Sequence, residues 1–114
     1  MHYRISFILV WLVLLSSTQA LWSKTVNYDL NLSEMTVNFS GKERRAMAIN
    51  GSIPGPTLRF TEGDDAVIRV KNDLKEESSI HWHGILLPND QDGVPHVNMS
   101  PIKPGEIREY RYRL

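Results

Sequence analysis

The strongest constraint on the fold is a period of two in hydrophobicity along several short stretches. Apolar residues at positions 26, 28, 30 and 32 alternate with polar residues between them, as in a strand with one buried face. Residues 66–70 (AVIRV) are β-branched and also alternate. After the first twenty residues, no stretch of ten or more shows a helical period. This pattern predicts an all-β fold.

Turn signals separate the stretches that we predict to be strands. Glycine and proline are dense in residues 51–56 (GSIPGP), and Ser40-Gly41 and Glu62-Gly63-Asp64 are typical of turns. The predicted strands cover residues 26–32, 35–39, 45–50, 66–70, 79–87 and 106–114, and residues 57–60 are short and extended. Residues 88–104 form a long loop, which in a compact domain is often functional. Short strands at this spacing favour a sandwich or a barrel.

The first twenty residues have a different character. One positive charge precedes an apolar run at residues 5–15, and the small residues 16–20 (SSTQA) offer a cleavage point after Ala20. This is the pattern of a secretory signal peptide, and the apolar run is short for a membrane span. We therefore predict a signal peptide at 1–20 and an exported domain at 21–114, with an uncleaved anchor as the alternative.

The charge and cysteine content of residues 21–114 exclude several classes of function. With Arg4 removed, 12 basic residues oppose 13 acidic ones, 12 − 13 = −1, which gives no electrostatic attraction to nucleic acid or to an anionic membrane. Cysteine is absent, so no disulfide stabilises the domain and no thiolate metal site can form within it.

The last residues, 106–114, have the pattern of a strand without a closing turn. We expect a fragment of a longer protein, against the alternative of a complete short domain.

The most distinctive short motif is residues 80–84, I-H-W-H-G. On a strand, His81 and His83 would project from one face while Trp82 turns to the other, and Gly84 would allow close approach of a backbone or ligand. Neutral imidazole binds copper, zinc, iron and nickel, but two imidazoles do not complete a coordination shell. Taken alone, such a pair is more often two surface or packing histidines that bind no metal, and the spacing does not specify which metal would bind.

Several motifs in order resemble the first cupredoxin (plastocyanin-like) domain of multicopper oxidases, and most of all bacterial copper-resistance proteins of the CopA type. The matching stretches are residues 49–59, 62–64, 80–84, 92–95 and 102–106. The resemblance implies a Greek-key β-sandwich or barrel, incomplete at its C-terminus. It also implies that His81 binds the type 2 copper and His83 one type 3 copper of a trinuclear cluster. The other ligands of such a cluster, and the type 1 copper site, would come from domains that follow in the same polypeptide.

Three loop residues are further candidates. Asp92 matches an acidic residue that in this family helps to deliver protons to oxygen, although Asp92-Gly93 is also a common turn sequence. His96 falls where many relatives have glycine and is more simply a solvent-facing loop residue than a third ligand. Met99 could bind Cu(I) through its thioether, but a single methionine is weak evidence.

The resemblance implies an exported, periplasmic or secreted multicopper oxidase in copper resistance. Such an enzyme couples one-electron oxidation of Cu(I) or phenolic compounds to the reduction of O₂ to water. Two alternatives remain open from the sequence: a non-enzymatic periplasmic protein that sequesters copper, and a cupredoxin module whose histidines have lost their metal.

Overall fold

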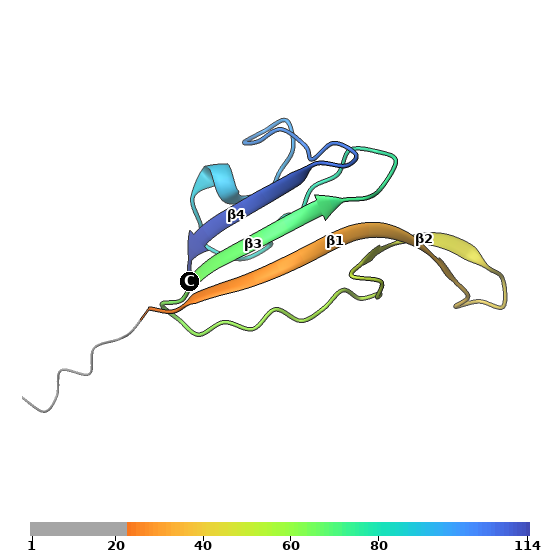
Figure 1. Cartoon of the computed structure of the whole chain (residues 1–114), viewed down its shortest axis with the longest axis horizontal. Coiled ribbons are helices and arrows are strands. Elements are labelled where there is room, and N and C mark those ends of the chain that lie inside the picture. Colours follow the sequence, from red (N-terminus) through yellow and green to blue (C-terminus); the bar gives the residue numbers. More distant parts are fainter. Residues whose placement is uncertain (1–22) are drawn as a thin grey trace, which may run out of the picture.

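The computed structural model describes residues 23–114, and the predicted signal peptide lies outside this range. Its strands and its single-turn 3-10 helix alternate with long connections (Figure 1). They are β1 (Thr25–Val37), β2 (Arg44–Ile49), β3 (Asp65–Asn72), η1 (Asn89–Gln91) and β4 (Ile107–Arg113). The predicted all-β class is confirmed. Among the described residues, no helix is long and apolar enough to span a membrane.

The strands form one sheet in the order β2-β1-β3-β4. β1 runs parallel to β3, whereas the β1–β2 and β3–β4 pairs are antiparallel. The first part of β1 pairs with β3 as far as Leu32, and the part from Leu32 onward pairs with β2. In Figure 1, β2 accordingly lies beside the far, curved end of β1.

The change of partner explains one error in the predicted strands. The sequence predicted two strands, at residues 26–32 and 35–39, but the structure has one continuous strand to Val37. Ser33 and Glu34, which lie between the two predicted strands, stay in register with Ala48 and Met47 of β2. Polar residues do not interrupt a strand when their backbone groups keep a ladder partner.

The predicted strand at residues 79–87 is also wrong. Only an isolated bridge between Ser78 and Ile102 precedes it, and the chain then runs without strand pairing into a turn at His83-Gly84. The extended residues 57–60 likewise join no strand. Both segments are explained in the same way. β-branched and aromatic residues favour an extended backbone, but they cannot by themselves supply a partner strand.

The core lies on one face of the sheet. Ile68 and Val70 of β3 and Tyr110 of β4 are almost wholly buried there. The connection between β3 and β4, residues 73–106, covers this face with Ile102, which is buried, and with the partly buried Trp82. This covering loop carries all of the candidate site residues.

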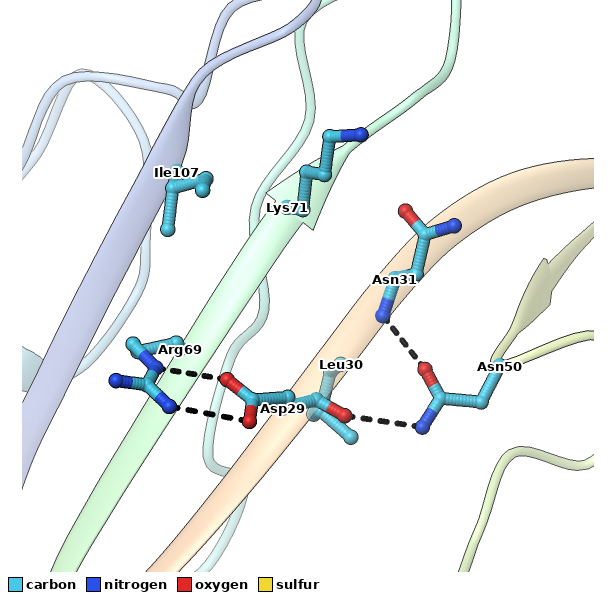
Figure 2. Close-up of a pocket in the computed structure, with 7 residues that line it drawn as sticks. All are labelled: Asp29, Leu30, Asn31, Asn50, Arg69, Lys71 and Ile107. Atoms are coloured by element: carbon cyan, nitrogen blue, oxygen red, sulfur yellow. Dashed lines mark hydrogen bonds and ion pairs between the residues drawn. The ribbon is translucent and has the colours of Figure 1, made fainter.

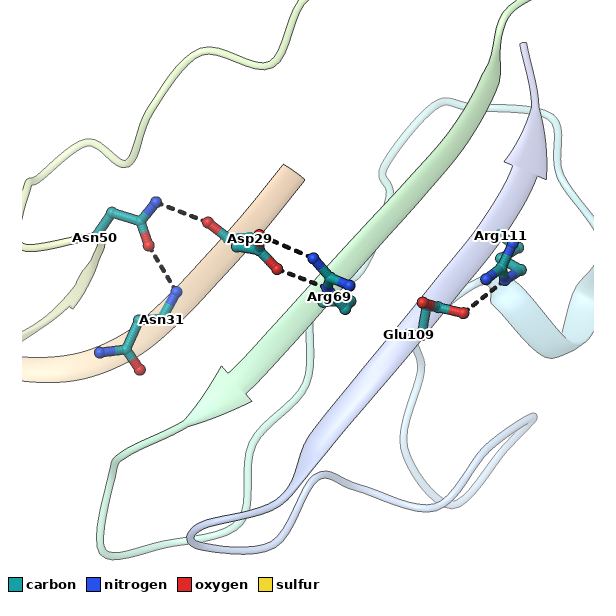
Figure 3. Close-up of polar contacts among 6 residues, drawn as sticks. All are labelled: Asp29, Asn31, Asn50, Arg69, Glu109 and Arg111. Atoms are coloured by element: carbon teal, nitrogen blue, oxygen red, sulfur yellow. Dashed lines mark hydrogen bonds and ion pairs between the residues drawn. The ribbon is translucent and has the colours of Figure 1, made fainter. Parts of the chain in front are cut away.

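The opposite face of the sheet is polar. Arg69 of β3 donates two hydrogen bonds to the Asp29 carboxylate on β1, at 2.7 and 3.1 Å, as Figure 3 shows. These bonds lower the pKa of Asp29 below its usual value. The Asn50 side-chain oxygen Oδ1 accepts a hydrogen bond of 2.6 Å from the Asn31 backbone N–H, which connects Asn50 to the same strand. A shallow pocket of about 240 Å³ lies here (Figure 2), but its charged groups already pair with one another or, for Lys71, with Asp73.

Candidate metal centre

The histidine motif is anchored to the core face of the sheet by its tryptophan. The Trp82 ring packs against the rings of Tyr110 and Tyr112 on β4, with centroids 5.4 and 5.6 Å apart. Edge-on contacts of this kind add to the free energy gained by burying large aromatic side chains. Trp82 therefore turns toward the sheet, as predicted, and the two histidines are left on the other side.

Backbone hydrogen bonds hold the start of the motif. Ser78 and Ile102 exchange two bonds of 3.0 and 2.8 Å, so that the loop is tied to itself just before the histidines. The Ile80 amide then points to the Tyr110 hydroxyl at 3.4 Å, a long contact. These contacts fix the position of the segment just before His81, although the segment does not form a regular strand.

The two histidine rings lie next to each other. Their centroids are 5.6 Å apart and their planes are nearly perpendicular, at 85°. Although the predicted strand is absent, the two rings still lie side by side, as the strand prediction had placed them. The pair thus presents two imidazoles to the same region of space.

His81 is oriented by the backbone of Asp92. Its Nδ1 lies 2.8 Å from the Asp92 carbonyl oxygen. A carbonyl can only accept a hydrogen bond, so Nδ1 carries the proton and Nε2 of the neutral ring keeps its lone pair. A hydrogen bond of this type to the second ring nitrogen is typical of metal-binding histidines. The His81 side chain is 43% exposed, so the ring is not enclosed by the described residues.

Gly93 makes this contact possible. A Cβ atom at this position would lie 1.7 Å from the Ile80 carbonyl oxygen, and the backbone φ is +83°. Both facts require glycine. At Gly84, no atom of another described residue lies within 4 Å of a virtual Cβ, and the φ of +79° suits the turn at His83-Gly84. The space predicted at Gly84 is therefore open, and its use by a ligand stays a prediction.

The Asp92 carboxylate lies beside the same ring. Its Oδ2 is 3.6 Å from His81 Nδ1 and accepts a hydrogen bond of 3.2 Å from Nδ2 of Asn98. The side chain is 29% exposed, so it is in contact with both solvent and the histidine. Asp90 points elsewhere and accepts from the Gln91 side chain. Of the two loop aspartates, only Asp92 faces the histidine pair.

The other candidates are not brought to the pair. His96 is mostly exposed, and its ring is 3.4 Å from Glu77. It adopts a φ of +63°, which glycine would adopt with less strain. The Met99 sulfur lies 3.9 Å from the Tyr110 hydroxyl and packs against the core. Within residues 23–114, no three His, Cys, Asp or Glu side chains are grouped as a complete metal site.

The residues present fit copper in part. Two neighbouring imidazoles, one with its free Nε2 defined by a backbone contact, are suitable ligands for copper. A metal ion held by the two rings would need further donors, and no third His, Cys, Asp or Glu side chain of residues 23–114 completes such a group.

Comparison with known proteins identifies the family of this chain. The sequence model of the family described as multicopper oxidase matches residues 31–114. The chain belongs to the multicopper oxidase family. It is 49% identical over 87 residues to copper resistance protein A of Pseudomonas syringae pv. tomato, covering 76% of this chain and 14% of that protein.

Solved multicopper oxidases share its fold. A multi-copper oxidase from Pseudomonas thermotolerans superposes with a TM-score of 0.76 at 36% identity, covering 81% of this chain and 23% of that one. A metallo-oxidase from Campylobacter jejuni superposes with a TM-score of 0.70 at 38% identity, covering 83% and 20%. The chain therefore corresponds to a small part of each relative, and the family connects it with copper.

The sequence analysis missed two residues of the site. Gly93 was noticed only as part of a turn, although a glycine after an acidic residue in a long loop can also mark a close backbone approach. Asn98 carries no signal by itself, because its partners Asp92 and Val94 are found only from the folded loop.

Proposed function

We propose that His81 and His83 are copper ligands of a trinuclear cluster in an exported multicopper oxidase, with His81 on the type 2 copper and His83 on a type 3 copper. The observation that carries this proposal is the pair of adjacent rings with the His81 Nδ1 proton bound to the Asp92 carbonyl. Membership of the multicopper oxidase family supports copper as the metal. Copper, when bound, supplies the one-electron redox chemistry.

The residues of this chain would hold and orient the cluster. His81 would ligate through Nε2, because its Nδ1 is already used in the hydrogen bond to Asp92. Trp82, packed on Tyr110 and Tyr112, would fix the backbone between the two ligands. Further cupredoxin domains of the same polypeptide would supply the remaining donors, since the chain spans about a seventh of the relative described above.

Asp92 would act as a proton relay. Reduction of O₂ to water consumes protons as well as electrons, and a partly exposed carboxylate beside a ligand can pass them from solvent. The exposed fraction of Asp92 and its 3.6 Å distance from His81 Nδ1 support this role.

The substrate we propose is Cu(I), with phenolic compounds as the second candidate, and the biological role is copper resistance. This follows from the similarity to a copper resistance protein and to a metallo-oxidase. The composition of residues 1–20 supports export to the periplasm or secretion.

Replacing His81 tests the metal assignment. In the protein expressed at the full length of its gene, His81→Ala should abolish the type 2 copper signal in electron paramagnetic resonance and stop O₂ consumption. His96→Ala is the matched control, because that ring is exposed and bound only to Glu77, and it should leave both unchanged. An intact type 2 signal in His81→Ala would refute the assignment. Bound copper without O₂ consumption in the unmodified protein would instead favour the non-enzymatic copper binder.

Replacing Asp92 tests the proton relay. Asp92→Asn keeps the backbone carbonyl that orients His81 but removes the carboxylate. We expect kcat for O₂ reduction to fall by about 10²-fold, with copper content close to that of the unmodified protein. A kcat within twofold of the unmodified enzyme would show that Asp92 is only a turn residue.

A further inference from the structure

The side chain of Asn98 uses both ends of its amide within the site loop. Its Oδ1 accepts from the Val94 backbone N–H at 3.2 Å. Its Nδ2 donates to the Asp92 carboxylate at 3.2 Å and lies 3.4 Å from the Asn89 side-chain oxygen. The Asn98 backbone N–H also points to the Val94 carbonyl, at 3.3 Å. One partly buried residue therefore joins both sides of the loop that carries Asp92.

The contacts continue from Asn98 to the candidate ligand. Asn98 holds the carboxylate of Asp92, and the carbonyl of Asp92 accepts the proton of His81 Nδ1. Gly93 keeps this part of the loop against the Ile80 carbonyl. The Asp92 carbonyl also accepts a long hydrogen bond of 3.4 Å from the Trp82 backbone N–H. This series of hydrogen bonds, together with the packing of Trp82, orients His81.

We infer that Asn98 is a positioning residue for the copper site, which acts through Asp92 to hold His81 with its Nε2 toward the metal. The inference rests on the proposed function of His81 as a type 2 copper ligand. The side-chain hydrogen bonds of Asn98 go to Val94, Asn89 and Asp92, so its effect on His81 is indirect.

The variant Asn98→Asp tests the donor end of the amide separately from its acceptor end. Asn98→Asp has nearly the same shape and keeps an oxygen that can accept from Val94 N–H. It replaces the donor toward Asp92 with a second carboxylate oxygen, and two like charges at this distance repel each other. The loop should then move away from His81. Asn38→Asp makes the same charge change at an exposed position just after β1 and is the matched control.

A reciprocal double variant restores the hydrogen bond. In Asp92→Asn with Asn98→Asp, the amide at position 92 can donate to the carboxylate at position 98. The loop contact is rebuilt with its polarity reversed, while position 92 still lacks a carboxylate. Positioning of His81 and proton transfer by Asp92 can therefore be measured separately in the same protein.

The test is made on the full-length, copper-loaded protein, with retention of type 2 copper during dialysis against a chelator as the main measurement. We expect about tenfold weaker retention in Asn98→Asp, no change in Asn38→Asp, and recovery to within about twofold of the unmodified protein in the double variant, judged against that same tenfold loss. Equal retention in Asn98→Asp and the unmodified protein, or a double variant no better than Asn98→Asp, would overturn the inference.

Turnover then distinguishes this inference from the proposed function. Recovered copper with low O₂ consumption in the double variant supports both positioning by Asn98 and the Asp92 relay. Recovery of both copper and turnover supports positioning and excludes the relay. If His81→Ala leaves the type 2 signal intact, the ligand assignment itself fails, and the inference about Asn98 is overturned with it.

Discussion

The sheet and the loop that covers it are built in different ways, although both are needed for one site. The ladders of β1 with β3 and of β3 with β4 pair seven or more residues each, and the side chains of Ile68 and Val70 are wholly buried. The histidine segment has no ladder. It is held by the packing of Trp82, by the close approach at Gly93, by the backbone bonds of Ser78 with Ile102 and of Trp82 with Asp92, and by a few side-chain hydrogen bonds.

This difference separates stability from function in the chain. When one contact in the sheet is lost, the many neighbouring contacts keep the strands in place. The main effect is then a lower free energy of unfolding. Loss of one loop contact changes the position of a ligand with little effect on the sheet, since few buried groups depend on it. Metal ligands need accurate placement, so under the proposed function the loop contacts would matter more for copper binding than their small number suggests.

The largest expected effect on the sheet comes from Ile68. Ile68→Ala empties a fully buried position in β3 and should destabilise the domain by about 2–5 kcal/mol. Hydrogen exchange of peptides from residues 65–72 of the full-length protein should become much faster. Copper bound per folded molecule should stay the same. A selective loss of copper without faster exchange would show that sheet and site are not separate in the way described.

The converse variant is Gly93→Ala. The added Cβ would meet the Ile80 carbonyl, and the positive φ alone costs about 1–2 kcal/mol. We expect at least about tenfold weaker copper retention, with unchanged hydrogen exchange in β3. Gly41→Ala is the control, because Gly41 has a similar φ of +82° but no atom within 4 Å of the virtual Cβ. Equal copper retention in the two variants would mean that the close approach at Gly93 is not needed.

The same contrast explains how much the sequence could predict. Periodicity of two locates β1, although as two strands, and β3, because most side chains there alternate in burial, a property of the local sequence. The absence of a strand at residues 79–87 was not predictable, since strand formation requires a partner and the partner is not encoded locally. The adjacency of His81 and His83 was predicted from an extended backbone and is seen, whereas their copper assignments remain predictions.

The contacts within the loop could not be predicted from the sequence. The Asp92 carbonyl, Gly93 and Asn98 act on residues 11 positions or more away, or through turns whose geometry no simple pattern specifies. Asp92 was a candidate only through the family resemblance, and its place beside His81 is consistent with that candidacy. The role of Asn98 required the folded loop.

Tyr112 lies where the two regions meet, and its titration can sharpen the comparison. Its ring packs on Trp82, and burial raises the pKa of Tyr112 to about 12. In the unfolded chain a tyrosine ionises near pH 10, so between about pH 10 and 12 the folded state binds more protons than the unfolded state. Stability should therefore be unaffected below pH 10 and should fall as the pH rises through this window.

Ultraviolet absorbance of tyrosinate measures this titration. The unmodified protein should show a group that titrates near 12. This group should be missing in Tyr112→Phe, which keeps the ring against Trp82. A difference titration centred near 10 would mean that the covering loop leaves Tyr112 open to solvent, and that the histidine segment is not anchored to the sheet through Trp82.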